Sequence, residues 1–146
     1  MAKIEVSTVI NRPVEEVFAV LSNEENRPKW SATTIEVKKM TEGTIGAGTT
    51  WLGVDRIFGR RMERESVFTE YQPNHKITQK STSGPVPFEI QLMYEPIEGG
   101  TRVIVIAEAQ PRGLFKLAGP LLMRLRKRQF ATDLANVKAM IEADAF

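Results

Sequence analysis

The stretch NRPVEEVFAVLSNEENRPKW (residues 11–30) decides the fold, because it predicts two short helices in succession. In the first, Pro13 suits an opening helical turn, the two glutamates after it suit the positive end of a helix, and apolar residues recur at helical spacing. The second helix is predicted to begin after Asn23, a good N-cap residue, and to end near Pro28. A pair of short helices is therefore expected before residue 31.

Strands are predicted on both sides of this helical pair. Residues 3–11 alternate apolar and polar side chains, as a half-buried strand does. Six further strand candidates follow, separated by turns rich in glycine, proline and asparagine: residues 33–40, 49–58, 60–71, 75–82, 86–96 and 101–109. The C-terminal segment is helical, with one apolar stripe formed by Phe130, Leu134, Val137 and Ile141. Short turns predict an antiparallel sheet, and the long helix must bury its stripe on the concave face of that sheet.

The glycine-rich segment GTIGAGTTWLG (43–53) raises the question of a phosphate-binding loop. A dinucleotide fingerprint needs a third glycine and a following helix, but Trp51 occupies the third position and the next residues favour a strand. No Gly-Lys-Ser/Thr follows, which excludes a P-loop. We expect a loop that enters a strand, with no phosphate site.

The composition is that of a soluble globular protein. The 146 residues suit a single domain over 1–146, and 42% are hydrophobic and 26% charged. A net charge of +2 is too balanced to predict a nucleic-acid partner. The absence of cysteine excludes disulfides and thiolate metal sites, and no apolar run approaches the ~20 residues of a membrane span. With no signal-peptide pattern at the N-terminus, we expect a cytoplasmic protein.

The order of elements resembles the START-like (SRPBCC) superfamily and, within it, the polyketide cyclase/dehydrase group of small bacterial proteins. The resemblance covers residues 3–143 and rests on the helical stretch quoted above, GAGTTW (46–51), VFTEYQP (67–73) and EGGTRVIVIAEAQPRG (98–113). It implies an α+β helix-grip fold: a seven-stranded antiparallel sheet wrapped around a long C-terminal helix. It also implies a pocket between them, whereas a generic sheet-and-helix domain would fill that space with side chains. Members bind lipids, hormones, polyketides or cofactors, and only some are enzymes.

Hairpin register predicts which side chains face this pocket. With a turn at Gly59-Arg60, Asp55 lies opposite Arg64, and one face carries Trp51, Gly53, Asp55, Ile57, Met62, Arg64, Ser66 and Phe68. With a turn at Gly99-Gly100, Tyr94 lies opposite Val105, Leu92 opposite Ala107 and Ile90 opposite Ala109. The residues expected at a ligand are Trp51, Asp55, Ile57, Met62, Arg64, Ser66, Phe68, Phe88, Ile90, Leu92 and Tyr94 from strands, and Trp30, Phe130 and Leu134 from helices.

Asp55 and Arg64 form the polar exception on this face, and two interpretations stay open. They are a half-solvated cross-strand ion pair that adds little stability, or a polar anchor inside an apolar pocket. As an anchor, Arg64 would hold a carboxylate, phosphate or enolate oxygen while Asp55 orients it. Burial would favour the anchor, because a buried pair is costly to keep. Each tryptophan either packs in the core or lies on the wall of the pocket. Core packing is the favoured interpretation for Trp30, and the register places Trp51 on the pocket wall.

No catalytic constellation is predicted. The single histidine, His75, lies in a turn where we expect it to be exposed at the rim of the sheet. No metal-ligand spacing, nucleophile elbow or cofactor motif is present. We therefore expect no catalytic residues, no metal and no cofactor.

The segment GLFKLAGPLLMRLRKR (113–128) is apolar almost all round and ends in bases. One interpretation is a lid over the pocket mouth, formed by a loop or short helix at residues 112–118. Another is peripheral membrane contact through Leu117, Leu121 and Leu125 with Arg124, Arg126, Lys127 and Arg128, since interfacial helices combine leucine with bases.

The predicted function is the binding or carriage of a hydrophobic small molecule, lipid-like, aromatic or polyketide-like. The alternative is a cyclase, dehydratase or aromatase that uses the same pocket. A third hypothesis is a protein- or membrane-interaction module acting through residues 113–128. The expected state is a monomer or weak homodimer.

Overall fold

The computed structural model describes residues 2–109 and 119–146. Its elements follow in the order β1 (Ala2–Ile10), α1 (Val14–Ser22), the 3-10 helix η1 (Glu24–Asn26), α2 (Arg27–Trp30), β2 (Thr34–Lys39), β3 (Thr50–Ile57), β4 (Arg60–Gln72), β5 (Lys76–Ser83), β6 (Phe88–Ile97), β7 (Gly100–Ala109) and α4 (Gly119–Glu142).

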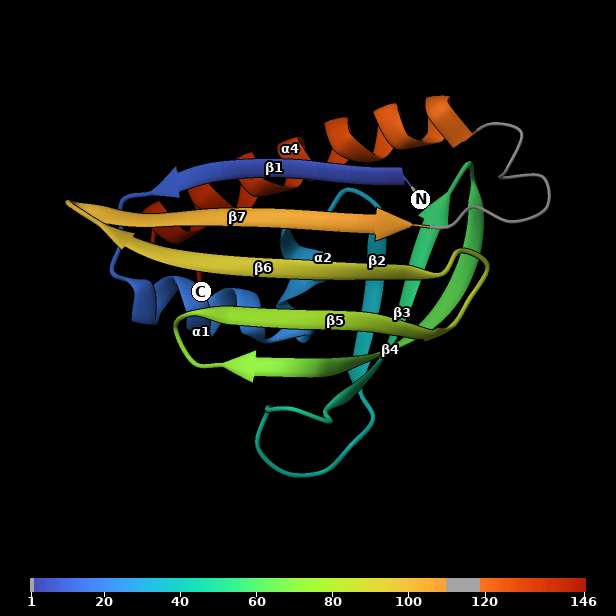
Figure 1. Cartoon of the computed structure of the whole chain (residues 1–146), viewed down its shortest axis with the longest axis horizontal. Coiled ribbons are helices and arrows are strands. Elements are labelled where there is room, and N and C mark those ends of the chain that lie inside the picture. Colours follow the sequence, from blue (N-terminus) through green and yellow to red (C-terminus); the bar gives the residue numbers. More distant parts are fainter. Residues whose placement is uncertain (1, 110–118) are drawn as a thin grey trace.

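All seven strands form one antiparallel sheet in the order β1-β7-β6-β5-β4-β3-β2. Figure 1 shows how strongly the sheet curls, since β2 and β3 run across the direction of β5, β6 and β7. The long helix α4 runs along β1, and α1 and α2 lie on the same side of the sheet. The predicted architecture is confirmed.

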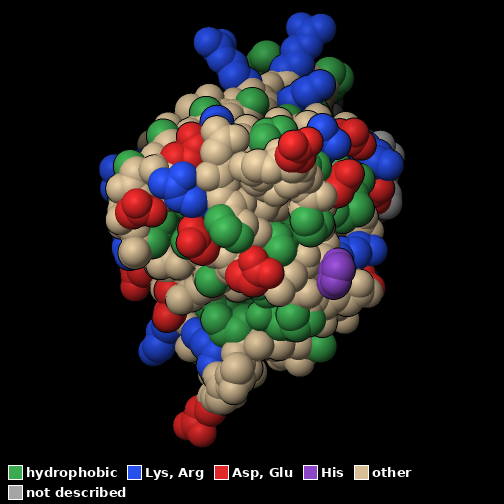
Figure 2. All heavy atoms as spheres, turned by 90° about the vertical axis from the view of Figure 1, so that its left-hand side faces the viewer, with side chains coloured by type: hydrophobic (Ala, Val, Ile, Leu, Met, Phe, Trp, Pro, Cys, Tyr) green, Lys and Arg blue, Asp and Glu red, His purple; other side chains and the backbone are tan. Residues whose placement is uncertain are grey.

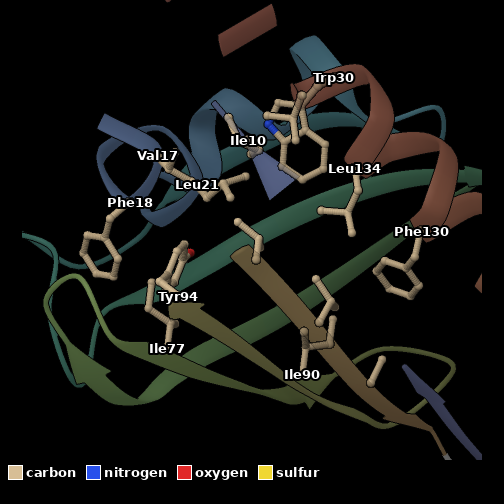
Figure 3. Packing of buried hydrophobic residues seen from close by; sticks show 14 of the residues in the cluster. Ile10, Val17, Phe18, Leu21, Trp30, Ile77, Ile90, Tyr94, Phe130 and Leu134 are labelled. Atoms are coloured by element: carbon tan, nitrogen blue, oxygen red, sulfur yellow. The ribbon is translucent and has the colours of Figure 1, made fainter. Parts of the chain in front are cut away.

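The core lies between the helices and the concave face of the sheet. Figure 3 shows side chains of α1, α2 and α4 pointing toward those of β5 and β6. The predicted stripe of α4 is buried along its whole length: Phe130, Leu134, Val137 and Ile141. A helix buries such a stripe only against another apolar layer, and the sheet supplies it.

The second short helix differs from the prediction at its end. The Asn23 side chain accepts a hydrogen bond from the Glu25 backbone N–H at 3.1 Å, which confirms the N-cap. Pro28 does not end the helix, however, because it lies in the first turn of α2, where a missing N–H costs no hydrogen bond. The chain stays helical to Trp30.

The predicted register of the β3–β4 hairpin is wrong by two residues. Asp55 lies opposite Met62, and Gly53 lies opposite Arg64. The turn is Phe58-Gly59, with φ of 51° and 74°, so the glycine is the second turn residue rather than the first. Since the error is an even number, every side chain stays on its predicted face.

The β6–β7 hairpin shows the same error. Tyr94 lies opposite Val103, Leu92 opposite Val105 and Ile90 opposite Ala107. Here too the glycine with positive φ, Gly99 at 81°, is the second turn residue. The strand pairing shifts by two residues, and the faces again stay as predicted.

Candidate functional site

A cavity of about 100 Å³ lies at one end of the curled sheet, under the first turns of α4. Most of its wall comes from β3, β4, the ends of β6 and β7, the β5–β6 loop and α4, on the right in Figure 1, and residues of β1, α2, β2 and β5 complete it. The lining runs from buried Gln79 and Ile90 to exposed Glu63 and Pro85. The lining thus reaches from the core to the surface at this end of the sheet.

Half of the predicted site residues meet at this cavity. The lining includes Asp55, Ile57, Met62, Arg64, Phe88, Ile90 and Phe130. Ile90 of β6 and Phe130 of α4 form opposite walls (Figure 3). Ala107, which pairs with Ile90 on the neighbouring strand, is small enough to leave the space open.

The other predicted site residues lie outside the lining. Trp51 and Phe68 are in contact, with ring centroids 5.4 Å apart, and Tyr94 packs edge-on against Phe18. The full set is Trp30, Trp51, Ser66, Phe68, Leu92, Tyr94 and Leu134, all buried except the half-buried Leu92. These side chains fill the core beside and beyond the cavity, and their contact with a ligand stays a prediction. Ser66 is linked to the cavity through one hydrogen bond, because its hydroxyl accepts a 2.7 Å hydrogen bond from the cavity residue Gln79.

The Asp55–Arg64 pair is buried and well ordered. Arg64 Nε donates to Asp55 Oδ2 at 2.7 Å, Thr34 donates its hydroxyl to Oδ1 at 2.8 Å, and Asp55 is only 7% exposed. Burial alone would raise the pKa of Asp55, but the charge and hydrogen bond of Arg64, with the Thr34 hydroxyl, lower it below the ordinary value. Asp55 is thus a carboxylate at neutral pH.

Gly53 makes this pair possible. Because Arg64 lies opposite Gly53 rather than Asp55, its side chain must cross the neighbouring strand diagonally to reach the carboxylate. A Cβ at position 53 would lie 2.6 Å from Arg64 Cζ, so the guanidinium occupies the space that a side chain would fill. A glycine inside a strand is a sequence signal for such a close approach.

Two further arginines line the cavity, and the sequence analysis did not assign them to it. Arg27 of α2 lies over the Trp30 ring at 5.2 Å, and Arg126 of α4 lies over the Phe130 ring at 5.4 Å. Burial first, and then the positive charges of Arg27 and Arg64, lower the pKa of Arg126. Helical spacing is the sequence signal that could have placed Arg126 in the cavity, because Arg126 precedes Phe130 by four residues and therefore lies on the same buried stripe of the helix.

The remaining polar groups carry no evident chemistry. His75 is exposed, as predicted, and Figure 2 shows the histidine on the surface at the end of the molecule away from the cavity. Burial raises the pKa of the Tyr94 hydroxyl, which has no hydrogen-bond partner among the residues that the structure describes. Across residues 2–109 and 119–146, no group of three side chains is arranged to hold a metal ion. In the same residues, no helix is long and apolar enough to cross a membrane.

A curled seven-stranded sheet that grips a long C-terminal helix, with a cavity between the two, defines the helix-grip class of ligand-binding folds. The profile of one family, described as polyketide cyclase / dehydrase and lipid transport, matches residues 1–142. The chain belongs to this family.

Solved structures of several proteins share the fold. The protein TTHA0849 from Thermus thermophilus superposes with a TM-score of 0.86 at 17% identity, over 99% of this chain and 100% of that one. The Zhui aromatase/cyclase from Streptomyces sp. R1128 superposes with a TM-score of 0.83 at 15% identity, over 99% of this chain and 96% of that one. A START superfamily protein from Mycobacterium smegmatis superposes with a TM-score of 0.83 at 12% identity, over 97% of both chains. No curated protein matches the chain.

Proposed function

We propose that this protein binds a hydrophobic small molecule in the cavity under α4, with the Asp55–Arg64 pair as its polar anchor. The observation that carries this proposal is the burial of that ion pair in the cavity wall, beside the apolar side chains of Ile57, Ile90 and Phe130. Removing two charges from water costs several kcal/mol per ion, and an apolar pair of similar volume would serve stability as well. A pair kept at this position has a use in orienting a polar group of the ligand.

The size of the cavity limits what it encloses. Its volume of about 100 Å³ is below the ~300 Å³ at which pockets for drug-sized ligands begin. One aromatic ring or a short alkyl segment is the natural occupant, and a longer ligand would extend beyond the enclosed space.

The first test is native mass spectrometry of freshly purified protein, followed by solvent extraction of what is bound. The second is an amide NMR titration with indole, a neutral ring that matches the cavity. We expect saturable shifts at Ile90, Ala107 and Phe130. Ala107→Leu, which fills the space, should weaken binding at least tenfold, while Ala135→Leu on the exposed face of α4 should not. Shifts that spread over the surface, or that survive Ala107→Leu, would contradict the proposal.

An enzyme of the cyclase type is the alternative use of the same cavity. Two of the similar structures are aromatase/cyclases by name, the Zhui protein and the di-domain StfQ. In that case Arg64 would stabilise a developing enolate oxygen, and Asp55 would hold Arg64 in place. The two functions differ in the effect of Arg64→Met: a carrier loses affinity, whereas an enzyme loses turnover more than binding.

A second candidate function is contact with an anionic membrane through the outer face of α4. Leu121 and Leu125 are 61% and 43% exposed beside the exposed bases Arg124, Lys127 and Arg128. Of the other residues in the predicted contact, Arg126 faces the cavity instead, and Leu117 lies outside the described residues, as does the lid expected at 112–118. Vesicles of phosphatidylserine and phosphatidylcholine should sediment the protein, and vesicles of phosphatidylcholine alone should not. Leu121→Asp with Leu125→Asp should abolish that difference.

A further inference from the structure

The charges that point into the cavity are mostly positive. Three arginines, Arg27, Arg64 and Arg126, line it together with one inward carboxylate, Asp55. Glu63 and Glu108 also belong to the lining, but they alternate in sequence with inward residues on β4 and β7, so their side chains point to the convex face of the sheet. Asp55 is already paired with Arg64.

The Arg126 guanidinium uses few of its hydrogen-bond donors within the described part of the protein. Its Nη1 donates to the Gln129 side chain at 3.1 Å, and no ion pair to it is formed among residues 2–109 and 119–146. The nearby acid Asp133 is engaged elsewhere, because it accepts hydrogen bonds from the Ser31 hydroxyl and the Ala32 backbone N–H. A guanidinium has five N–H groups, so Arg126, which lines the cavity, keeps several of them without an acceptor among the residues described.

Arg27 adds a second positive charge to the wall of the cavity. Its Nε is fully buried and finds no hydrogen-bond partner in the described part of the chain, while its Nη1 lies 3.7 Å from the Glu24 carboxylate. Stacking on Trp30 holds this guanidinium at the cavity wall as Phe130 holds that of Arg126. Both cations are therefore positioned before any ligand arrives.

We propose that the ligand of this cavity is a carboxylic acid, whose carboxylate binds Arg126 beside the positive charge of Arg27 while its apolar part lies against Ile90 and Phe130. This inference rests on the proposed function and specifies its ligand class. Arginine suits the role because its planar fork matches the two oxygens of a carboxylate. The Asp55–Arg64 pair stays intact in the complex, and its carboxylate directs the negative group of the ligand toward the other two arginines.

The test compares benzoate with benzamide, which has the same shape without the charge. In amide NMR titrations at pH 7, we expect both to shift the resonances of Ile90 and Ala107, with benzoate binding at least tenfold tighter. Arg126→Met keeps the aliphatic packing on Phe130 and should abolish this preference, leaving benzamide affinity within twofold of wild type. Arg126→Lys keeps the charge and should retain part of the preference.

The matched control is Arg124→Met, on the exposed face of the same helix turn, which should leave both affinities unchanged. Equal binding of the two probes to the wild type would overturn the acid inference and leave hydrophobic binding standing. Equal loss of benzoate affinity in Arg124→Met and Arg126→Met would also overturn it, since the effect would then be one of general surface charge. If indole, benzamide and benzoate all fail to bind, the proposed function itself is refuted. Thermal melting of each variant, with a midpoint close to wild type, ensures that folded proteins are compared.

Discussion

Replacing Gly53 with alanine would place a methyl group where the Arg64 guanidinium now lies. The new Cβ would sit 2.6 Å from Cζ and 2.7 Å from Nη1, whereas ordinary contact begins at 3.4 Å. The backbone of Gly53 has no positive φ, so alanine fits the strand, and the long Arg64 side chain is the group that moves. A shift of about 0.8 Å takes Nε out of the 2.7–3.2 Å range of a hydrogen bond to Asp55.

The expected cost follows from two opposing terms. Losing a charge-assisted hydrogen bond destabilises the fold by about 1.5–3 kcal/mol. Alanine recovers about 0.5–1 kcal/mol of the backbone entropy that glycine loses on folding. The net expectation for Gly53→Ala is a loss of about 0.5–2.5 kcal/mol. In an Arg64→Ala background only the entropy term remains, so the same substitution should stabilise by about 0.5–1 kcal/mol.

Urea unfolding followed by tryptophan fluorescence measures this cycle, because Trp30 and Trp51 are both buried in the folded state. The matched control is Gly46→Ala, where a Cβ meets nothing within 4 Å and no loss of stability is expected. A reversal of sign between the two backgrounds identifies Arg64 as the cause. The reasoning is refuted if Gly53→Ala changes the free energy of unfolding equally in both backgrounds, or stabilises the wild type.

Three other predictions concern the cavity and the hairpin at its mouth. Asp55 has a lowered pKa in the folded chain, so its stabilising contribution is present at neutral pH and is lost below about pH 4. The urea midpoint of the wild type should therefore fall more steeply between about pH 6 and 2 than the midpoint of Asp55→Asn. Thr34→Val removes the 2.8 Å hydrogen bond to that buried carboxylate and should cost about 1–3 kcal/mol in the same assay at pH 7, whereas no change would mean that water replaces the hydroxyl. Phe58 is 71% exposed at a φ of 51°, so Phe58→Asn should raise the free energy of unfolding by about 0.5–1 kcal/mol; a loss would show that the ring has contacts worth more than the strain.

Local chemistry in the sequence predicted most of the fold. The alternation along the strands, the stripe through Phe130 and Ile141, and the turn residues each indicated one element, and a resemblance to a known family supplied their arrangement. The register was wrong because a turn glycine fits two positions when only the sequence is known. The structure places Gly59 and Gly99 second in their turns, where φ is positive.

The site was less predictable, because a cavity depends on what the core leaves unfilled. Side-chain parity put Trp51, Phe68 and Asp55 on one face, yet two of these pack in the aromatic core and only Asp55 reaches the cavity. Arg27 and Arg126 were missed because bases near helix ends are usually solvated. Only the packing of α2 and α4 turns these two arginines inward.

The first turns of α4 have two faces with different surroundings. Leu122, Met123 and Arg126 wall the cavity, while Leu121 and Leu125 on the other side of the same turns meet solvent. A rigid helix cannot move one face without the other, so any partner that shifts these turns also changes the shape of the cavity. Thermodynamic reciprocity then requires the occupant of the cavity to change the affinity of the outer face by the same factor. Ligand binding in the cavity and binding of a partner to the outer face of α4 would thus be coupled, and a measurement of either one would report on the other.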